Sequence, residues 1–361
     1  MKKIIVISNT ALSIEKFRLH YLEYLKNFRI YIYTPWRKAK INKKFKQIKS
    51  FKFIPKNLIQ ELLYLNKIIS KDKSTFILCY SFKYQLIMGI LSLFRKFNVV
   101  AIIAGQGPFF NKKTLKNYIS QPFIKLLFSN FIKIICINNR DGLFFSKYLD
   151  RHISIIPTEG VRMSTAQRLN NKQKNFIFFS RLIRNKGIRE YIELAKNLKK
   201  KYNHLNFYVA GPHNKINIGQ SNSKNMLELV KNNSKYIKYL GNIKNYKNVF
   251  PKMDCLVSPS YAEGAGTSVL EAMMTRLFVI AYKNNGHNFI LKTTKNIICD
   301  ANFKSLTLSV EKYLKIKKVE LVKITKNSRK RVIKRFITPI IAKILIKHFN
   351  KIIKSKTFRK C

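Results

Sequence analysis

Two glutamates stand at a fixed distance in the stretch SPSYAEGAGTSVLEAMM, which runs from Ser258 to Met274. Seven residues, most of them small, separate Glu263 from Glu271. The chain has 72 Lys and Arg but only 16 Asp and Glu, so two carboxylates around a glycine turn stand out. A carboxylate accepts hydrogen bonds from two hydroxyls at once, and free N–H groups in a glycine turn bind phosphate. The stretch therefore has the chemistry to hold sugar hydroxyls with its carboxylates and a diphosphate with the N–H groups of its glycine turn.

The same residues also have a purely structural interpretation. Ser268 and Glu271 stand in the S-x-x-E order of a capping box, whose two side chains bond N–H groups at the start of a helix. The glycines would then only shape the turn. Residue types alone do not decide between the two interpretations.

A second group of candidate residues follows an apolar run at 176–180. Arg181, Arg184 and Lys186 stand in a short turn before a helix expected to begin near Gly187. Cations at the carboxyl end of a strand, beside a helix N-terminus, suit a diphosphate. A solvated charge is nevertheless the default for any one of 72 basic residues. A diphosphate-binding role for this turn therefore needs support from other motifs in the chain.

Short apolar runs alternate with amphipathic stretches along most of the chain. Continuous apolar strands that alternate with helices predict parallel sheets covered on both faces. A polar stretch at 163–175 reads as a linker between two such halves. The expected strands are 3–8, 29–34, 74–79, 99–104, 132–137 and 153–157, then 176–180, 205–211, 236–241, 254–258 and 278–282. Ligands bind beyond the carboxyl ends of such strands, where both candidate turns lie.

Composition narrows the class of protein. With 46% hydrophobic residues the chain has ample material for two cores, and its net charge of +56 attracts anions. The lysines are scattered, so compositional drift explains the charge as well as an anionic membrane does, and nucleic acid ranks below both. Five single cysteines without a C-x-x-C pair argue against disulfides and zinc. Buried free thiols at Cys79, Cys136 and Cys255, and a reducing cytoplasm, are expected.

No signal peptide or membrane span is expected. The apolar run Ile4–Ile7 is too short for the core of a signal peptide and reads as a first buried strand. The longest apolar run near it, Leu86–Phe94, falls well short of a membrane span. Any contact with a membrane is therefore expected to be peripheral.

Three motifs in the second half occur in the order typical of one enzyme family. They are the R-x4-K turn (Arg181, Lys186), the AGP turn at 210–212 with YLGNI at 239–243, and E-x7-E in EGAGTSVLEA at 263–272. Over roughly 175–300 the chain resembles the C-terminal domain of the retaining family-4 glycosyltransferases. The first half is more loosely similar to lipopolysaccharide, capsule and N-glycan-type transferases, through residues 9–27, 102–110, 137–149 and 155–161.

The resemblance implies an α/β protein of the GT-B type, with two doubly wound Rossmann-like domains facing a central cleft. It places an acceptor-side domain at 1–165 and a nucleotide-sugar domain at 166–330. A basic helical tail, 331–361, is expected to pack back toward the first domain.

The resemblance also implies a role for each matched residue. Arg181 and Lys186 hold the diphosphate and, with Glu263, form the catalytic group. Glu271 binds the ribose. The remaining donor-binding residues are Gly264, Ala265, Gly266, Thr267, Ser268, Gly211, Gly241, Asn242 and Ile243. On the acceptor side it implies Arg18, Gly105 and Gly107.

The chain departs from the family pattern in three places. Arg276 and Phe278 stand where relatives have Gly and Pro. Asn9 and Thr10 replace a glycine pair after the first strand, and Arg162 replaces an aspartate before the linker. The acceptor side is thus less like the family than the donor side.

The function that the resemblance implies is transfer of a hexosyl or N-acetylhexosaminyl group with retention of configuration. The donor is expected to be a nucleotide diphosphate sugar, UDP-linked, and no metal or other cofactor is expected. The acceptor is expected to be a glycan or lipid-linked sugar of surface polysaccharide synthesis, lipopolysaccharide or capsule. Asp141, Glu159 and His20 are weak candidates for a general base.

The expected location is peripheral, on the inner face of the cytoplasmic membrane. The Lys-rich segment Lys38–Lys56 and the basic stretch 327–336 are expected to hold the protein at an anionic surface. Two alternatives stay open. A nucleic-acid-binding protein would explain the charge, although no recognition motif is present and no such partner is expected. A GT-B-fold sugar-nucleotide epimerase would share the donor motifs.

Overall fold

The chain forms two compact units in the computed structural model. Unit 1 is Met1–Gly160 together with Thr338–Cys361, and unit 2 is Val161–Ile337. The structure describes residues 2–35, 48–54, 57–69, 75–105, 109–110, 115–165, 167, 174–212, 223–243, 245–264 and 266–354. The unit limits lie a few residues from the expected 165/166 and 330/331. Val161 pairs with Ile337 in a single parallel bridge, which joins the residues after Gly160 to unit 2.

Within the described residues, unit 1 contains a seven-stranded parallel sheet in the order β3-β2-β1-β4-β5-β6-β7. Its strands are β1 Lys2–Ile7, β2 Phe28–Thr34, β3 Ile48–Phe53, β4 Phe76–Cys79, β5 Asn98–Ile103, β6 Lys133–Cys136 and β7 Ser154–Ile155. The runs of Ile, Val and Phe that predicted strands are buried on both faces, as parallel strands require. The sheet places the turns that follow β1, β4 and β5 along one edge.

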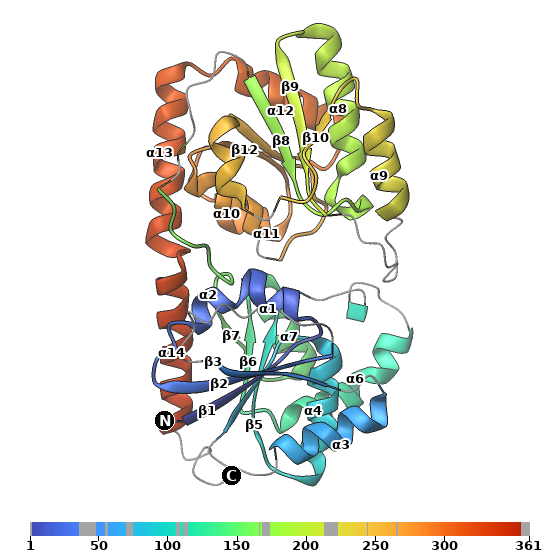
Figure 1. Cartoon of the computed structure of the whole chain (residues 1–361), viewed down its shortest axis with the longest axis vertical. Helices are drawn as coiled ribbons and strands as arrows, with labels where there is room; N and C mark the ends of the chain where they lie inside the picture. The colour runs from blue at the N-terminus through green and yellow to red at the C-terminus, as the bar shows by residue number, and fades with distance from the viewer. Residues whose placement is uncertain are drawn as a thin grey trace. The chain divides into compact units, whose positions relative to one another are not determined.

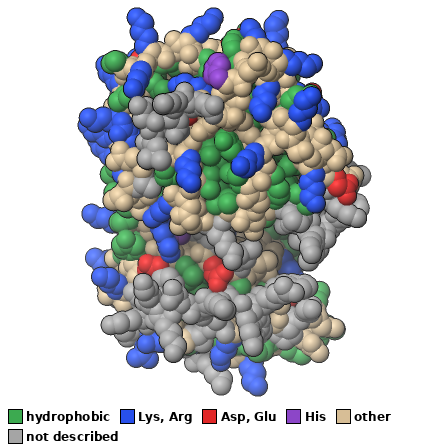
Figure 2. Space-filling view, turned by 45° about the horizontal axis from the view of Figure 1, so that its top comes forward, with side chains coloured by type: hydrophobic (Ala, Val, Ile, Leu, Met, Phe, Trp, Pro, Cys, Tyr) green, Lys and Arg blue, Asp and Glu red, His purple; other side chains and the backbone are tan. Residues whose placement is uncertain are grey.

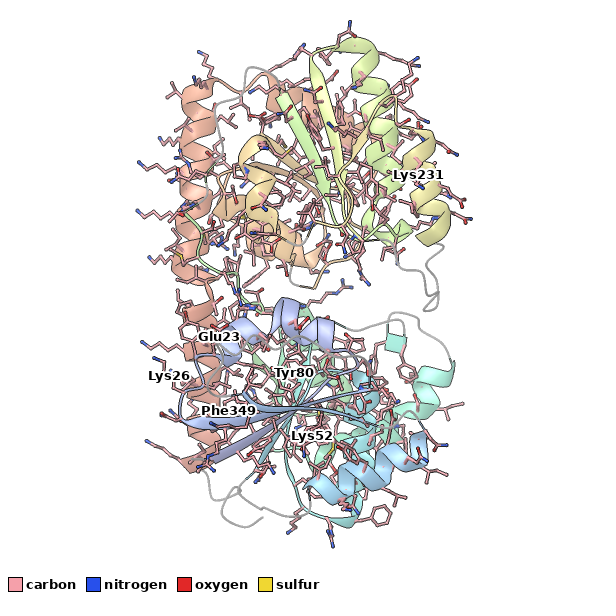
Figure 3. The ribbon with its side chains drawn as sticks, in the orientation of Figure 1. Glu23, Lys26, Lys52, Tyr80, Lys231 and Phe349 are labelled. Atoms are coloured by element: carbon pink, nitrogen blue, oxygen red, sulfur yellow. The ribbon has the colours of Figure 1, made fainter. Side chains whose placement is uncertain are left out.

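Helices cover both faces of this sheet (Figure 1). The helices are α1 Ala11–Phe17, α2 Leu19–Leu22, α3 Leu58–Ile69, α4 Phe82–Phe94, α6 Leu115–Ser129, α7 Asn139–Leu149 and α14 Thr338–Lys354. α3, α4, α6 and α7 supply one apolar core with the sheet. α14 packs beside α2, and its Phe349 contacts Phe28 and Phe76 with ring centroids 5.8 and 5.5 Å apart (Figure 3).

Unit 2 repeats the plan with a six-stranded parallel sheet, counted over the described residues, in the order β10-β9-β8-β11-β12-β13. Its strands are β8 Lys174–Phe179, β9 Leu205–Ala210, β10 Lys238–Tyr239, β11 Cys255–Ser258, β12 Phe278–Tyr282 and β13 Ile297–Cys299. Its helices are η1 Arg184–Lys186, α8 Ile188–Lys201, α9 Ser223–Asn232, η2 Tyr246–Asn248, η3 Phe250–Lys252, α10 Thr267–Met274, α11 Asn285–Leu291, α12 Phe303–Leu314 and α13 Lys318–Arg335. α8, α9 and α12 lie on one face and α10, α11 and α13 on the other. The doubly wound α/β fold predicted for both halves is confirmed.

The basic C-terminal region divides between the two units. α13 belongs to unit 2 and α14 to unit 1, and the chain turns between them at Phe336 and Ile337. Pro339 is the second residue of α14, where a missing N–H costs no helical bond. In the interior of one continuous helix it would clash with the carbonyl one turn earlier. The helix therefore ends and restarts ahead of it.

The described residues test two of the expectations from composition, the buried thiols and the lack of a membrane span. Cys79, Cys136, Cys255 and Cys299 are buried and form no disulfide among the described residues, which confirms the expectation of buried thiols for the first three. No described helix is both long and apolar enough to span a bilayer. Lys and Arg side chains spread over the face seen in Figure 2, with few Asp and Glu among them.

Candidate active site

The turn that carries Lys186 packs closely against the loop that follows β11. The contact is made by Gly187 with Pro259, 72 residues further along the chain. Gly187 has φ 76°, in the left-handed region, and starts α8. A Cβ at Gly187 would lie 2.0 Å from the carbonyl oxygen of Pro259, so no other residue fits there. The close approach joins the turn after β8 to the loop after β11. The two motifs thus become neighbours at one edge of the sheet.

Lys186 and Glu263 form an ion pair across that junction. Lys186 Nζ lies 2.7 Å from Glu263 Oε1, and the two side chains are only 13% and 15% exposed. Nζ also donates to the carbonyl of Ala262 at 3.1 Å. The carboxylate and the Ala262 carbonyl together fix the ammonium group in a mostly desolvated turn. Two of the three predicted catalytic residues are therefore in direct contact.

The backbone around Glu263 is fixed from two sides. The carbonyl of Asn185 accepts the N–H of Tyr261 at 3.1 Å, and Asn284 Nδ2 donates to the carbonyl of Ser260 at 2.8 Å. A Cβ at Gly286 would lie 2.6 Å from the Glu263 carbonyl oxygen, so the start of α11 packs directly on this backbone. The carboxylate is therefore presented by a rigid loop.

His287 is a residue of this region that sequence reasoning missed. Its side chain is fully buried, with Nδ1 2.8 Å from the carbonyl of Tyr282 and Nε2 3.2 Å from Ser258 Oγ. Burial lowers the pKa of His287, and the nearby Glu263 carboxylate partly opposes that shift. The imidazole is therefore neutral at pH 7 and supports the end of β11. No spaced histidine pair marked it, because its partners come together through the fold.

The start of α10 decides between the two interpretations of Ser268. The helix begins at Thr267, and its N-cap is Gly266 in the left-handed conformation, φ 47°, with no side-chain cap bond. Ser268 is therefore inside the first turn, and the capping-box interpretation is wrong. Glu271 lies in the second turn of the helix. It is partly buried, and its charge raises the pKa of Tyr246 together with the burial of that phenol, which is the larger cause.

Two further glycine turns lie at the same edge of the sheet. Gly211 has φ 154°, and a Cβ there would lie 1.7 Å from the carbonyl oxygen of Ser180. Its N–H donates to the carbonyl of Gly241 at 2.9 Å. Gly241 has φ 75° with open space where a side chain would be. The AGP and YLGNI motifs thus meet the end of β8, next to Arg181, with Asn242 and Ile243 following Gly241.

Arg181 lies at the end of β8, at this same edge of the sheet. Its side chain is solvent-exposed, and within the described residues no carboxylate pairs with it. Gly264 and Thr267 complete the turn between Glu263 and α10, and both are partly exposed. Ala265 and Gly107, two of the predicted site residues, lie outside the described residues. The donor-binding roles of the whole set stay predictions.

The acceptor-side residues belong to unit 1. The Arg18 guanidinium is buried, 3.0 Å from Glu159 Oε1, and lies over the ring of Tyr80 at 4.3 Å (Figure 3 labels Tyr80). His20 Nε2 is 3.1 Å from the Glu159 carbonyl oxygen. Burial raises the pKa of Glu159, and Arg18 opposes that shift. Gly105 has φ 146° with no atom near its Cβ position. Arg18 is thus already engaged by Glu159, and its role toward an acceptor stays a prediction.

Asp141, the other carboxylate considered as a base, has a structural role. Asn138 is the N-cap of α7, its Oδ1 accepts the N–H of Asp141, and its Nδ2 donates to Asp141 Oδ2 at 2.7 Å. The pair caps the helix and is buried. This arrangement offers no free carboxylate for proton transfer.

The turn after α10 retains a glycine-type backbone despite its departure from the family pattern. Arg276, which stands where relatives have Gly, has φ 66°. Its guanidinium donates to Gln167 Oε1 at 2.9 Å. The left-handed conformation costs a non-glycine residue about 1–2 kcal/mol. The geometry of the turn is therefore maintained at the expense of stability.

Comparison with known proteins bears on the same unit. Residues 162–331, just under half of the chain, match the family model described as glycosyl transferases group 1. No curated protein matches the chain in sequence.

Solved structures match over nearly the whole length. Sucrose-phosphate synthase from Thermosynechococcus elongatus is 14% identical over 98% of this chain and 99% of its own, with a TM-score of 0.80. HepE from Anabaena, in complex with UDP and glucose, is 13% identical over 97% and 100%, with a TM-score of 0.79. A TarM variant from S. aureus, in complex with fondaparinux, alpha-GlcNAc-glycerol and UDP, is 12% identical over 98% and 100%, with a TM-score of 0.73. Unit 2 thus matches the glycosyl transferases group 1 model, on a chain with the fold of the GT-B glycosyltransferases.

Proposed function

We propose that this protein is a glycosyltransferase that moves a hexosyl or N-acetylhexosaminyl group from a UDP-linked sugar to a glycan or lipid-linked acceptor. The observation that carries the proposal is the Lys186–Glu263 ion pair, which lies beside the glycine turn leading into α10. These residues fall within the part that matches the glycosyl transferases group 1 model. The complexes of HepE with UDP-glucose and of TarM with UDP support a uridine donor. The role we propose is surface polysaccharide synthesis at the cytoplasmic membrane.

In the proposed reaction the bond between the sugar and the diphosphate breaks, and the leaving diphosphate carries the electron pair away. Arg181 and Lys186 stabilise that charge. Because these cations are already in position, no free energy is spent on reorienting solvent during the reaction. The acceptor hydroxyl attacks from the face that the diphosphate leaves, so the configuration is retained. A leaving phosphate oxygen takes the hydroxyl proton, and no protein base is assigned.

The two glutamates have different proposed roles. Glu263 fixes Lys186 and faces the donor sugar from the loop, whereas Glu271 accepts the ribose hydroxyls from the second turn of α10. The N–H groups of Gly264 and Gly266 bond the diphosphate or the sugar. Because Arg181 and Lys186 neutralise the negative charge of the diphosphate, we propose that no metal ion is required. Chelation by EDTA should then leave the rate unchanged.

Alanine variants test the donor site. Lys186→Ala should lower kcat about 100-fold or more, as loss of one preorganised donor does elsewhere. Glu271→Ala should weaken donor binding, measured by calorimetry with the UDP-sugar. Arg189→Ala is the matched control, because Arg189 is an exposed cation of the neighbouring helix α8 and is not among the predicted site residues. It should retain wild-type transfer.

A Glu271→Ala enzyme with wild-type turnover and donor affinity would contradict the proposed ribose contact. Incubation with donor alone separates transfer from the epimerase alternative. An epimerase would release a changed sugar without any acceptor, and the transferase would not.

A further inference from the structure

Three neighbouring helices of unit 1 carry an unusual share of exposed apolar side chains. α4 packs against both α3 and α6, and the three cover one face of the sheet (Figure 1). The exposed fractions are 81% for Phe94 and Tyr118, 71% for Ile119 and 67% for Ile59. We call the solvent side of α3, α4 and α6 the apolar helical face. Single exposed hydrophobic side chains are normal on a protein surface, whereas a concentration of them on neighbouring helices indicates an interaction surface.

The pattern is clearest on α6. Ile119, Phe123 and Leu126 follow one another at i, i+4 and i+7, which places them in one stripe on the helix. All three are more than half exposed. The core side of the same helix is formed by Ile124, Leu127 and Phe128, which are buried. The helix is thus apolar on two sides, and its solvent side contributes nothing to the core of unit 1.

Charge on this face has a single sign. α4 and α6 contain no Asp or Glu, and α3 contains only Glu61, which is fully buried and paired with Lys83 at 2.6 Å. The exposed cations are Lys67, Lys83, Arg95, Lys96 and Lys125. Lys125 has an exposed partner, Asp150 at 3.0 Å, at the end of α7. The surface therefore combines large apolar side chains with positive charge and complements an anionic apolar phase.

We propose that the apolar helical face docks on an anionic lipid bilayer. A second copy of the chain would bring like charges together, since the net charge is +56. Aliphatic Leu and Ile have no stacking partner in a nucleic acid, where aromatic and Arg side chains do the binding. The boundary between headgroups and acyl chains accepts Leu, Ile, Phe and Tyr together with Lys and Arg.

This surface differs from the two basic segments that the sequence suggested as anchors. Most of Lys38–Lys56 lies outside the described residues, and 327–336 lies at the end of α13 and its C-cap, in unit 2. Cations alone would hold the protein by screened attraction, whereas inserted side chains add a contribution that salt does not remove. A role in reaching a lipid-linked acceptor rests on the proposed function. Lipid binding itself does not, because it is measured without a sugar substrate.

Sedimentation of the full chain with vesicles tests the proposal. The vesicles are phosphatidylcholine alone or phosphatidylcholine mixed with phosphatidylglycerol. The double variant Ile119→Ser, Phe123→Ser removes two stripe side chains without adding charge. Its affinity for the anionic vesicles should fall roughly tenfold or more, because the transfer of two large side chains is lost. Val319→Ser is the matched control, since Val319 is 83% exposed on α13 of unit 2, and it should bind as wild type does.

Three results would overturn the proposal. The first is equal vesicle binding by wild type and the double variant. The second is wild-type protein that forms dimers without lipid, shown by analytical ultracentrifugation, and a double variant that does not, which would assign the face to a second copy. The third is a gel shift with random RNA that the double variant loses.

Transfer to a soluble acceptor should stay at the wild-type rate in the double variant, so a failure of lipid docking is distinct from a failure of the proposed function. Matching circular dichroism spectra and Tm values verify that the variants fold.

Discussion

Glu263 owes its position to residues far away in the sequence. Lys186 pairs with its carboxylate, Gly286 packs on its backbone carbonyl, and His287 contacts Ser258 at the end of the strand before it. The R-x4-K and E-x7-E motifs predicted that Lys186 and Glu263 belong to one site, but not that the two side chains form an ion pair. His287, Ser258 and Asn284 carry no such spacing and meet only after β11 and β12 pair. The capping-box interpretation was wrong because Gly266, in the left-handed conformation, is the N-cap of α10. The helix therefore already includes Ser268 in its first turn.

The buried imidazole of His287 predicts a pH effect on stability. Its folded pKa is lower than the ordinary 6.5, so below that pH the unfolded chain binds a proton that the folded chain excludes. The free energy of unfolding should therefore fall as pH drops below about 6.5, by at most ~1.4 kcal/mol per pH unit from this group. Thermal melts from pH 8 to pH 5 should show a shallower decline for His287→Gln than for wild type.

His204→Gln is the control for that series, because His204 is an exposed residue of the same unit. Its decline should match that of the wild-type protein. Equal slopes for wild type and His287→Gln would mean that the imidazole does not resist protonation. His348 in α14 also has a pKa lowered by burial, so the comparison is of slopes and not of absolute values.

At the scale of elements, long apolar runs were predicted well and short or polar ones were missed. The strand at 278–282 and the helix expected to begin near Gly187 match β12 and α8. A strand buried on both faces and a helix buried on one face each leave a clear apolar pattern. β3 was missed because its sequence, IKSFKF, alternates Lys and Ser with apolar residues at the edge of the sheet. β13 has only three residues, too few for any periodicity. Pro339 marks the break between α13 and α14 in the sequence. The prediction of one basic helical tail from 331 to 361 rested on charge and did not use this proline.

The turn after α10 allows a stabilising substitution. Arg276→Gly removes the left-handed strain and should raise the free energy of unfolding by about 1 kcal/mol, after the loss of an exposed bond to Gln167 and the added entropy of an unfolded glycine. Urea melts measure the change. Arg276→Ala removes the same side chain but leaves a Cβ in the strained conformation, so it should show no gain. A gain of the same size in both variants would attribute the effect to charge, not to the backbone.

At the scale of the whole molecule, unit 1 depends on α14. Phe349 packs on Phe28 and Phe76, and Ile341, Leu345 and Ile352 are buried beside it. A chain that ends at Ile337 should lose cooperative unfolding of unit 1 while unit 2 still melts. Phe349→Ala alone should cost about 3–5 kcal/mol. Calorimetry of both, against a chain that ends at Lys354, measures the contribution of the helix. Unit 1 that melts normally without α14 would contradict this dependence.

The division of the chain also sets an order of events during synthesis. Unit 2 is one continuous segment, Val161–Ile337, whereas unit 1 waits for residues that begin at Thr338. Domains generally fold as units while the ribosome is still adding residues, the N-terminal one first. Here the first 160 residues emerge without the helix that covers one side of their sheet. The half that is made second is therefore the first that can be completed, whereas the half that is made first is complete only once α14 has been synthesised.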